Sequence, residues 1–236
     1  MHEVVETLFR EIKTVDKPAN RTDYQRFYKE QLEDPIGLRT PVLRGVSNKV
    51  FRTVKALDKR EILDICDDVL ATGKRYARFV AFEWAGKLAD RCEKKDFARL
   101  ETWLKSYVTD WGSCDHLCGV LGKLLTRFPE LSTRRKPWIR SGNLWLRRAS
   151  AVSLIEPVKA GLLIEDVFET ARMLLRDEED LVQKGYGWML KVTGDHFHDE
   201  ARRFVMEHKD VMPRTALRYA IEKWPPAERR RAMEQR

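Results

Sequence analysis

Apolar residues recur along this chain at the spacing of one face of an α-helix, not in the alternation typical of a β-strand. The clearest stripe is Leu63, Ile65, Cys66, Val69 and Leu70, and similar stripes lie within 79–88, 120–125, 152–155 and 167–174. No Asn-Gly or Asp-Gly pair marks a hairpin turn between two apolar runs. The pattern therefore predicts an all-α fold.

Helix starts and breaks support this prediction. Thr40 precedes Pro41, which predicts a helix start with Thr40 as the capping residue, because the missing N–H of proline costs nothing in a first turn. Asn143 is expected to cap a helix that carries Trp145 to Ile155. Breaks are expected at Pro157, Gly161, Gly194, Pro213 and the pair Pro225-Pro226.

From about Lys59 onward, predicted helices of roughly 12 to 18 residues pair off with a period of about 35 to 40 residues, as in two-helix solenoid repeats. We therefore expect a superhelical solenoid of HEAT-like helical repeats. The repeats share spacing and an apolar stripe rather than sequence identity. We expect one domain over residues 1–236, with about the first 35 residues forming N-terminal capping helices.

Charge adds a candidate partner. Lys and Arg exceed Asp and Glu by 45 to 37, giving a net charge of +8 at pH 7. Basic residues gather in 132–148, in 39–60 and in the tail from Ala201. On successive repeats they could line a concave basic face that tracks DNA phosphates without reading bases. The alternative is an ordinary solvated positive surface.

Other features exclude some classes of protein. No run approaches the roughly 18 apolar residues of a membrane span, and the N-terminus mixes charged with apolar residues, unlike a secretory signal. We expect a cytoplasmic, nucleoid-associated, bacterial protein that acts as a monomer. Cys114, His116 and Cys118 only faintly resemble metal ligands, since only the two cysteines share a helix face and no second ligand pair follows. We expect buried thiols and no metal or cofactor.

Candidate chemistry lies in three separated places: Trp111 with Asp115, the pair Arg147-Arg148, and Trp188. Aromatic faces, a carboxylate and a guanidinium are the groups that can hold a nucleoside and stabilise a cationic sugar. Each also has an ordinary explanation. A tryptophan is more often part of a core, Asp115 could be a helix-start carboxylate, and one arginine could reach a buried carboxylate while the other faces solvent.

The other five tryptophans are assigned to packing: Trp84, Trp103, Trp138, Trp145 and Trp224.

Four segments in order resemble the AlkD-type DNA alkylation-repair proteins, which are HEAT-like DNA glycosylases. They are GLRTPVLRGVSNKV (37–50), DWGSCDHLC (110–118), NLWLRRASAVSLI (143–155) and QKGYGWMLKV (183–192). They are similar to the family's G-x-x-T-P-x-x-R, W-x-x-x-D, W-x-R-R and G-W-x-L patterns. Each is weak alone, but the ordered set is fairly specific.

The resemblance implies excision of positively charged N-alkylated purines, such as 3-methyladenine and 7-methylguanine, from double-stranded DNA. It implies a monofunctional glycosylase with no deep pocket for an extruded base. The catalytic positions of the family fall on Trp111, Asp115, Trp188 and Arg148, with Arg147 as the less favoured alignment for the arginine. The DNA-contacting positions fall on Thr40, Arg44, Arg147 and Arg148.

Two alternatives stay open. A catalytically inert relative would bind branched or damaged DNA, and it would lack the aromatic and carboxylate set. A HEAT-type protein scaffold would carry a neutral concave face, which the basic clusters disfavour.

Overall fold

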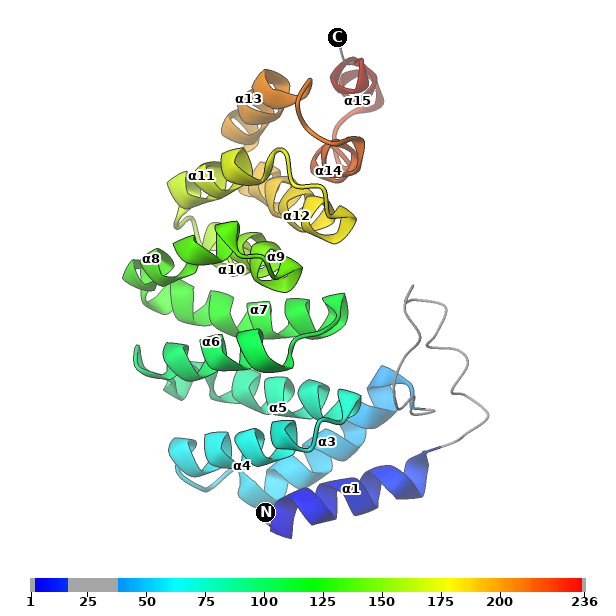
Figure 1. The fold of residues 1–236 in the computed structure, drawn as a ribbon, viewed down its shortest axis with the longest axis vertical. Helices are drawn as coiled ribbons and strands as arrows, with labels where there is room; N and C mark the ends of the chain where they lie inside the picture. Colours follow the sequence, from blue (N-terminus) through cyan, green and yellow to red (C-terminus); the bar gives the residue numbers. More distant parts are fainter. Residues whose placement is uncertain (1–2, 17–37, 235–236) are drawn as a thin grey trace. The chain divides into compact units, whose positions relative to one another are not determined.

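The computed structural model describes residues 3–16 and 38–234 (Figure 1). Every regular element in these residues is a helix, so the predicted all-α fold is confirmed. The chain forms two compact units, Met1–Cys92 (unit 1) and Glu93–Arg236 (unit 2). The expectation of one domain over residues 1–236 stays a prediction. Of the expected capping helices, α1 (Glu3–Val15) is present, and the rest of that expectation lies outside the described residues.

Unit 1 is a small helical cluster. It contains α1, α3 (Thr40–Val54), α4 (Lys59–Ala71), α5 (Arg75–Leu88) and the short 3-10 helix η2 (Ala89–Arg91). Helix α1 packs against α3 and α4, and α5 packs against the same two helices. In the core, the indole N–H of Trp84 donates to Ser47 Oγ at 3.0 Å, so this fully buried ring leaves no unsatisfied donor.

Helix α3 begins one residue earlier than predicted. The carbonyl of Arg39 accepts hydrogen bonds from the backbone N–H groups of Val42 and Leu43, so Arg39 is the capping residue and Thr40 lies in the first turn. Pro41 sits in that turn, as expected. The prediction that Thr40 caps this helix was therefore wrong, although the helix itself was predicted correctly.

Unit 2 carries most of the chain. Its elements are α6 (Asp96–Tyr107), α7 (Trp111–Arg127), η3 (Pro129–Leu131), α8 (Ser132–Arg135), η4 (Lys136–Arg140), α9 (Leu144–Val152), α10 (Ile155–Lys159), α11 (Ile164–Leu174), α12 (Asp180–His196), α13 (His198–His208), α14 (Arg214–Ala220) and α15 (Pro226–Met233).

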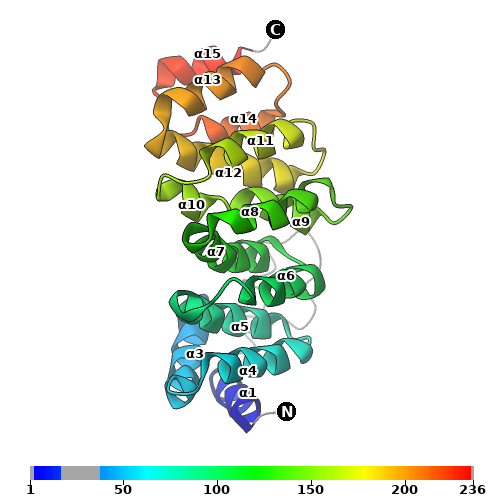
Figure 2. The ribbon, with the colours of Figure 1, turned by 90° about the vertical axis from the view of Figure 1, so that its left-hand side faces the viewer.

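Within unit 2, helices pack in chain order. Helix α7 packs against α6, α9 and α10, then α9 packs against α12, and α12 packs against α14 (Figures 1 and 2). Helix α11 packs against both α9 and α12. This packing is compatible with a helical repeat solenoid. Repeats of HEAT type and a concave basic face stay predictions.

Most predicted boundaries in unit 2 hold, but the helix expected to run to Ile155 ends at Val152, and neither Pro157 nor Gly194 is a break. Asn143 Oδ1 accepts the N–H of Trp145 at 2.8 Å and caps α9, as predicted. Gly161, at φ +78°, ends α10 in the left-handed conformation that glycine adopts without strain. Gly194 was wrong as a break, because α12 continues to His196. Pro157 lies inside the first turn of α10, where a missing N–H needs no partner.

Three of the five tryptophans assigned to packing are fully buried. Trp84, Trp103 and Trp138 are each at most 2% exposed, whereas Trp145 and Trp224 are partly exposed. No helix among the described residues is long and apolar enough to cross a bilayer.

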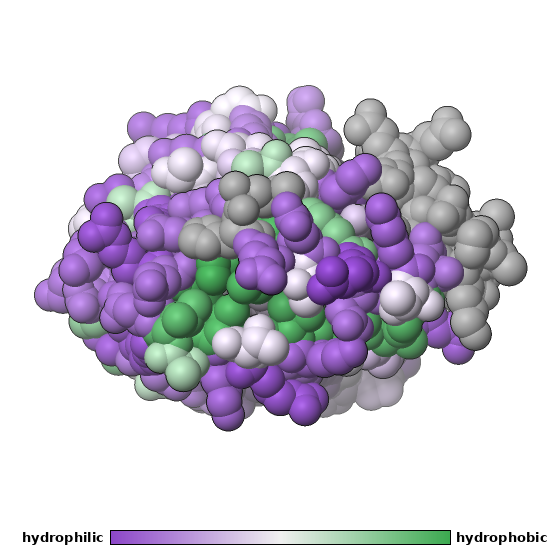
Figure 3. Space-filling model, turned by 90° about the horizontal axis from the view of Figure 1, so that it is seen from below, coloured by the Kyte–Doolittle hydropathy of each residue, from purple (hydrophilic) through white to green (hydrophobic). Residues whose placement is uncertain are grey.

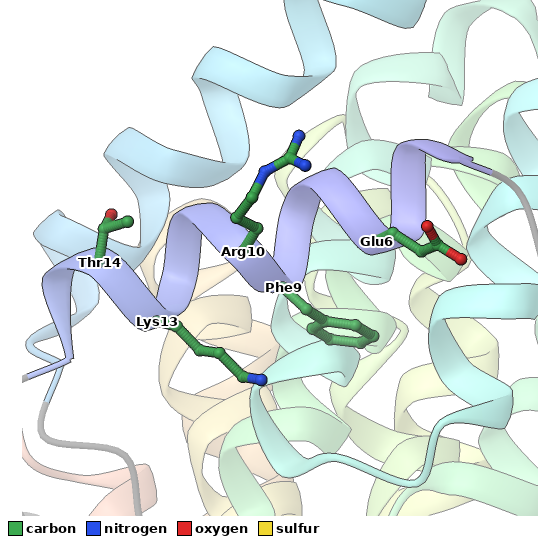
Figure 4. A pocket seen from close by; sticks show the side chains of 5 residues that line it. All are labelled: Glu6, Phe9, Arg10, Lys13 and Thr14. Atoms are coloured by element: carbon green, nitrogen blue, oxygen red, sulfur yellow. The ribbon is translucent and has the colours of Figure 1, made fainter.

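The face of unit 1 drawn in Figure 3 is mainly hydrophilic, with an apolar strip across it. A cavity of about 540 Å³ lies along α1 (Figure 4). Its lining side chains project from the outer side of that helix: Glu6, Phe9, Arg10, Lys13 and Thr14. None of them belongs to the predicted site, so this cavity does not mark it.

Candidate functional site

The first component of the candidate site is the start of α7. Asp110 caps this helix, since its Oδ1 accepts the N–H of Ser113 at 2.9 Å. The cap starts the helix at Trp111, so Trp111 and Asp115 lie one turn apart on the same side. Trp111 is 38% exposed, and the Asp115 side chain is 20% exposed. An aromatic ring and a carboxylate therefore share one partly exposed side of α7.

The second component is a two-pronged ion pair between α7 and α9. Arg148 donates from Nε to Asp115 Oδ1 and from Nη2 to Asp115 Oδ2, each at 2.8 Å. Its Nη1 donates to the backbone carbonyl of Leu181 in the first turn of α12. All three guanidinium nitrogens therefore have acceptors, and the Arg148 side chain is only 7% exposed. Such a planar, fork-to-fork contact fixes the orientation of the carboxylate.

Two opposing effects act on the pKa of Arg148. Burial by itself lowers the pKa of Arg148, but the hydrogen bonds and the negative charge of Asp115 outweigh it and raise the pKa above its ordinary value. Arg148 is therefore a permanent cation beside Asp115.

The third component is α12, which packs against α9. Gly185 faces Arg148 so closely that an added methyl group would lie 3.2 Å from Arg148 Cγ. Leu181, Gly185 and Trp188 are spaced four and three residues apart, which places them on one side of the helix. Trp188 is partly exposed and lies one turn beyond Gly185 along α12.

The two neighbouring arginines have different partners. Arg147 donates from Nε to Asp177 Oδ2 at 2.7 Å, while Arg148 holds Asp115. The alternative in which one arginine reaches a carboxylate and the other faces solvent is therefore only half right. Both hold carboxylates, because α9 lies between the start of α7 and the turn before α12.

The remaining predicted DNA contacts, Thr40 and Arg44, lie in unit 1 and are exposed. Arg44 Nε lies 3.3 Å from a carboxylate oxygen of Glu83, and its guanidinium stands 5.4 Å from the centre of the Phe79 ring. The Arg44 side chain is 50% exposed and that of Glu83 only 15%, so the cation is the more accessible partner of this pair.

The basic cluster in 132–148 is largely neutralised in the fold. Five of its six cations pair with carboxylates that lie about thirty residues away in sequence: Arg134 with Glu101, Arg135 with Asp166, Lys136 with Glu169, Arg147 with Asp177, and Arg148 with Asp115. Arg140 is exposed and has no carboxylate partner among the described residues. The run of positive charge in the sequence is thus much weaker in three dimensions.

Arg135 shows how far this pairing goes. Its side chain is completely buried, and it donates to Ser150 O and Thr170 Oγ1, both at 2.8 Å, and to Asp166 at 3.1 Å. It joins α8 to α9 and α11 and cannot contact DNA.

Two cysteines, Cys114 and Cys118, are buried on α7. Cys114 Sγ contacts the carbonyl of Trp145 at 3.6 Å, and Cys118 Sγ contacts that of Ala149 at 4.0 Å. Burial, together with the neighbouring Cys114, raises the pKa of the Cys118 thiol well above its ordinary value. The two thiols pack against α9. The described residues contain no group of three or more His, Cys, Asp or Glu side chains that could hold a metal ion.

Sequence reasoning missed Asp177 and Gly185. Asp177 lies in the connection before α12, where nothing in the sequence links it to Arg147. Gly185 carried a weak signal, since a glycine inside a helix marks a close approach of another group.

Comparisons with known proteins identify the family of this chain. The sequence pattern that defines the DNA alkylation repair enzyme family matches residues 8–224. A solved structure described as a "predicted DNA alkylation repair enzyme from Enterococcus faecalis" is similar, with a TM-score of 0.79 and 16% identity. The likeness covers 89% of this chain and 97% of that one, and at this identity it shows the fold alone. No curated protein matches significantly in sequence. The family match spans most of the chain, and the chain therefore belongs to the DNA alkylation repair enzyme family.

Proposed function

We propose that this protein is a monofunctional DNA glycosylase that excises positively charged N-alkylated purines, such as 3-methyladenine and 7-methylguanine, from double-stranded DNA. Membership of the DNA alkylation repair enzyme family supports a role in repair. The observation that carries the specific reaction is the Asp115 carboxylate, oriented by a buried arginine at a partly open edge of α7.

Excision of a cationic base needs a group that stabilises positive charge on the sugar, and a carboxylate can do so. An alkylated purine already carries a positive charge, so it leaves as a neutral base and needs no strong general acid. The sugar left behind develops positive charge as the glycosidic bond stretches. A fixed carboxylate near C1′ stabilises that charge and can orient the attacking water.

The geometry leaves Asp115 able to act in this way. Arg148 approaches both carboxylate oxygens, yet the side chain keeps 20% of its surface exposed. Each oxygen has a further lone pair, so the exposed side can face a sugar or a water. Trp111, one turn earlier and more exposed, can offer its ring to the cationic base, and Trp188 is proposed to act in the same way from α12.

The contacts of Arg148 favour a role in orienting Asp115 over a direct contact with DNA. The resemblance places Arg148 among both the catalytic and the DNA-contacting positions. With its three nitrogens engaged by Asp115 and Leu181, Arg148 is better suited to holding the carboxylate in register. We propose that it acts through Asp115.

The proposed partner is duplex DNA with an alkylated base. Thr40 and Arg44 are proposed to contact its backbone, and exposed cations such as Arg140 are better candidates for phosphate contacts than the paired ones.

A second candidate function is a DNA-binding relative without catalysis. The same ion pair favours it in one respect, because a buried arginine–carboxylate contact between α7 and α9 could be purely structural.

The test is release of free base from a duplex with a single 7-methylguanine, measured by mass spectrometry beside a lesion-free duplex. We expect free 7-methylguanine and an abasic site, with strand breaks only after alkali. Duplex binding without any release would favour the non-catalytic function.

A further inference from the structure

Arg147 uses every nitrogen of its guanidinium within the protein. Nε and Nη2 donate to the two oxygens of Asp177, at 2.7 and 3.4 Å, and Nη1 donates to the carbonyls of Ser141 and Gly142, at 2.8 and 3.3 Å. The Arg147 side chain is 18% exposed, and that of Asp177 is 7% exposed. This is a nearly buried, fully engaged pair.

Asp177 in turn organises the entry into α12. Its Oδ1 accepts the N–H of Glu179, the residue that caps α12, at 3.0 Å. Its backbone carbonyl accepts Nε2 of Gln183, one turn into the helix, at 2.8 Å. Arg147 therefore connects α9 to Asp177, whose hydrogen bonds to Glu179 and Gln183 hold the start of α12.

The neighbouring arginine reaches the same stretch from the other side. Arg148 donates to the carbonyl of Leu181, in the first turn of α12, and to both oxygens of Asp115. Consecutive helix residues point about 100° apart, so the two side chains diverge around the start of α12. A shift of this first turn would remove the Leu181 acceptor and change how Arg148 meets Asp115.

We infer that Arg147 is a positioning residue, which acts through Asp177 to fix the first turn of α12 so that Arg148 holds Asp115 in its working orientation. This inference rests on the proposed function, and it replaces the DNA contact that the sequence suggested for Arg147. A phosphate could bind Arg147 only by displacing a carboxylate that is almost buried, which would leave that charge unpaired.

The test compares Arg147→Gln and Asp177→Asn, separately and together, with Lys136→Gln as the control. Lys136 on η4 also pairs with a carboxylate, that of Glu169 on α11, but both side chains are about half exposed. Three quantities are measured well below the melting temperatures: hydrogen exchange of the amides in 180–184, the excision rate constant at saturating enzyme, and the salt dependence of duplex binding.

We expect both single variants to speed exchange in 180–184 and to slow excision by about tenfold, with the double variant no slower than the singles. The slope of log affinity against log salt should stay unchanged in both, and the control should match the wild type in exchange. A phosphate ligand at Arg147 predicts otherwise. Arg147→Gln would then reduce the slope by about 0.9, and Asp177→Asn, which frees the arginine, would tighten binding.

The inference would be overturned if the salt dependence followed the pattern of a phosphate ligand at Arg147. It would also be overturned if amide exchange in 180–184 were unchanged in both Arg147→Gln and Asp177→Asn. If the wild type excises nothing, the proposed function fails, while exchange and salt dependence still decide the role of Arg147.

Discussion

Gly185 on α12 lies directly against Arg148 on α9. A methyl group at position 185 would stand 3.2 Å from Arg148 Cγ and 3.4 Å from its Nη1. The absence of a side chain at this position thus makes room for the arginine that holds Asp115. Gly185 on α12 contacts Arg148 on α9, which in turn binds Asp115 on α7. A substitution at position 185 can therefore disturb the site without removing any of its side chains.

Gly185→Ala should slow excision while changing stability little. Alanine favours a helix over glycine by about 0.5 to 1 kcal/mol, which offsets the cost of pushing Arg148 aside. Gly119→Ala is the matched control, since a methyl group there meets nothing within 4 Å and position 119 also lies inside a helix. That variant should be more stable and fully active. Equal excision rates for both variants would show that the position of Arg148 does not matter.

Arg148→Lys should keep the positive charge but lose the two-pronged contact, because an ammonium group cannot match both carboxylate oxygens in one plane. We expect excision to fall by at least about tenfold with only a modest loss of stability. Arg148→Ala should also cost about 2 to 3 kcal/mol in the free energy of unfolding, since it leaves Asp115 without its counter-charge. Urea unfolding and single-turnover excision measure the two effects. Wild-type turnover in Arg148→Ala would remove this residue from the site.

Arg140→Ala should weaken duplex binding and lower the salt slope by about 0.9, as expected for one lost phosphate contact. Arg140 is the exposed cation of the 132–148 cluster without a carboxylate partner among the described residues. Arg134→Ala is the comparison, because Arg134 Nη2 already lies 2.8 Å from Glu101. Titrations at several salt concentrations should show a change in the first variant alone. The reverse order would mean that DNA displaces the internal carboxylates.

Glu101 predicts a specific dependence of stability on pH. Burial raises the pKa of this carboxyl, but hydrogen bonds from Arg134, Lys105 and Trp138 outweigh burial and hold the pKa below its ordinary value. A lowered pKa in the folded state means a contribution that is complete above the unfolded value, about 4.3, and is lost as the pH falls through the folded value.

Glu101→Gln should therefore be less stable than the wild type at pH 7, and this difference should shrink as the pH falls below about 4. Urea unfolding at pH 7 and at pH 3.5 measures it. Glu169→Gln, which breaks an exposed pair with Lys136, should differ little from the wild type at either pH. A difference for Glu101→Gln that does not depend on pH would exclude the charge as its cause.

Helical periodicity and local capping were sufficient to predict the fold class and the start of α9 after Asn143. Both depend on interactions within about one turn, which a single sequence displays. The partners of the arginines could not be predicted, because Asp115 and Arg148, or Arg147 and Asp177, are about thirty residues apart and meet only when successive helices pack. The cluster at 132–148 therefore looked like free positive charge, although distant carboxylates neutralise most of it.

The misplaced boundaries have local reasons. Thr40 has the side chain of a capping residue, but the carbonyl of Arg39 accepts the first helical hydrogen bonds. Glycine lowers helix stability, so Gly194 suggested a break in the helix. It instead lies within the last turn of α12, close to Ala201.

The most direct measurement is single-turnover release of 7-methylguanine from a duplex by the wild type, Asp115→Asn and Asp166→Asn. Asp166 is a matched control, since it also accepts from a buried arginine, Arg135, but lies on α11. We predict release by the wild type and by Asp166→Asn, and release at least about a hundredfold slower by Asp115→Asn with duplex binding retained. Release by Asp115→Asn at the wild-type rate would contradict the central role of this carboxylate.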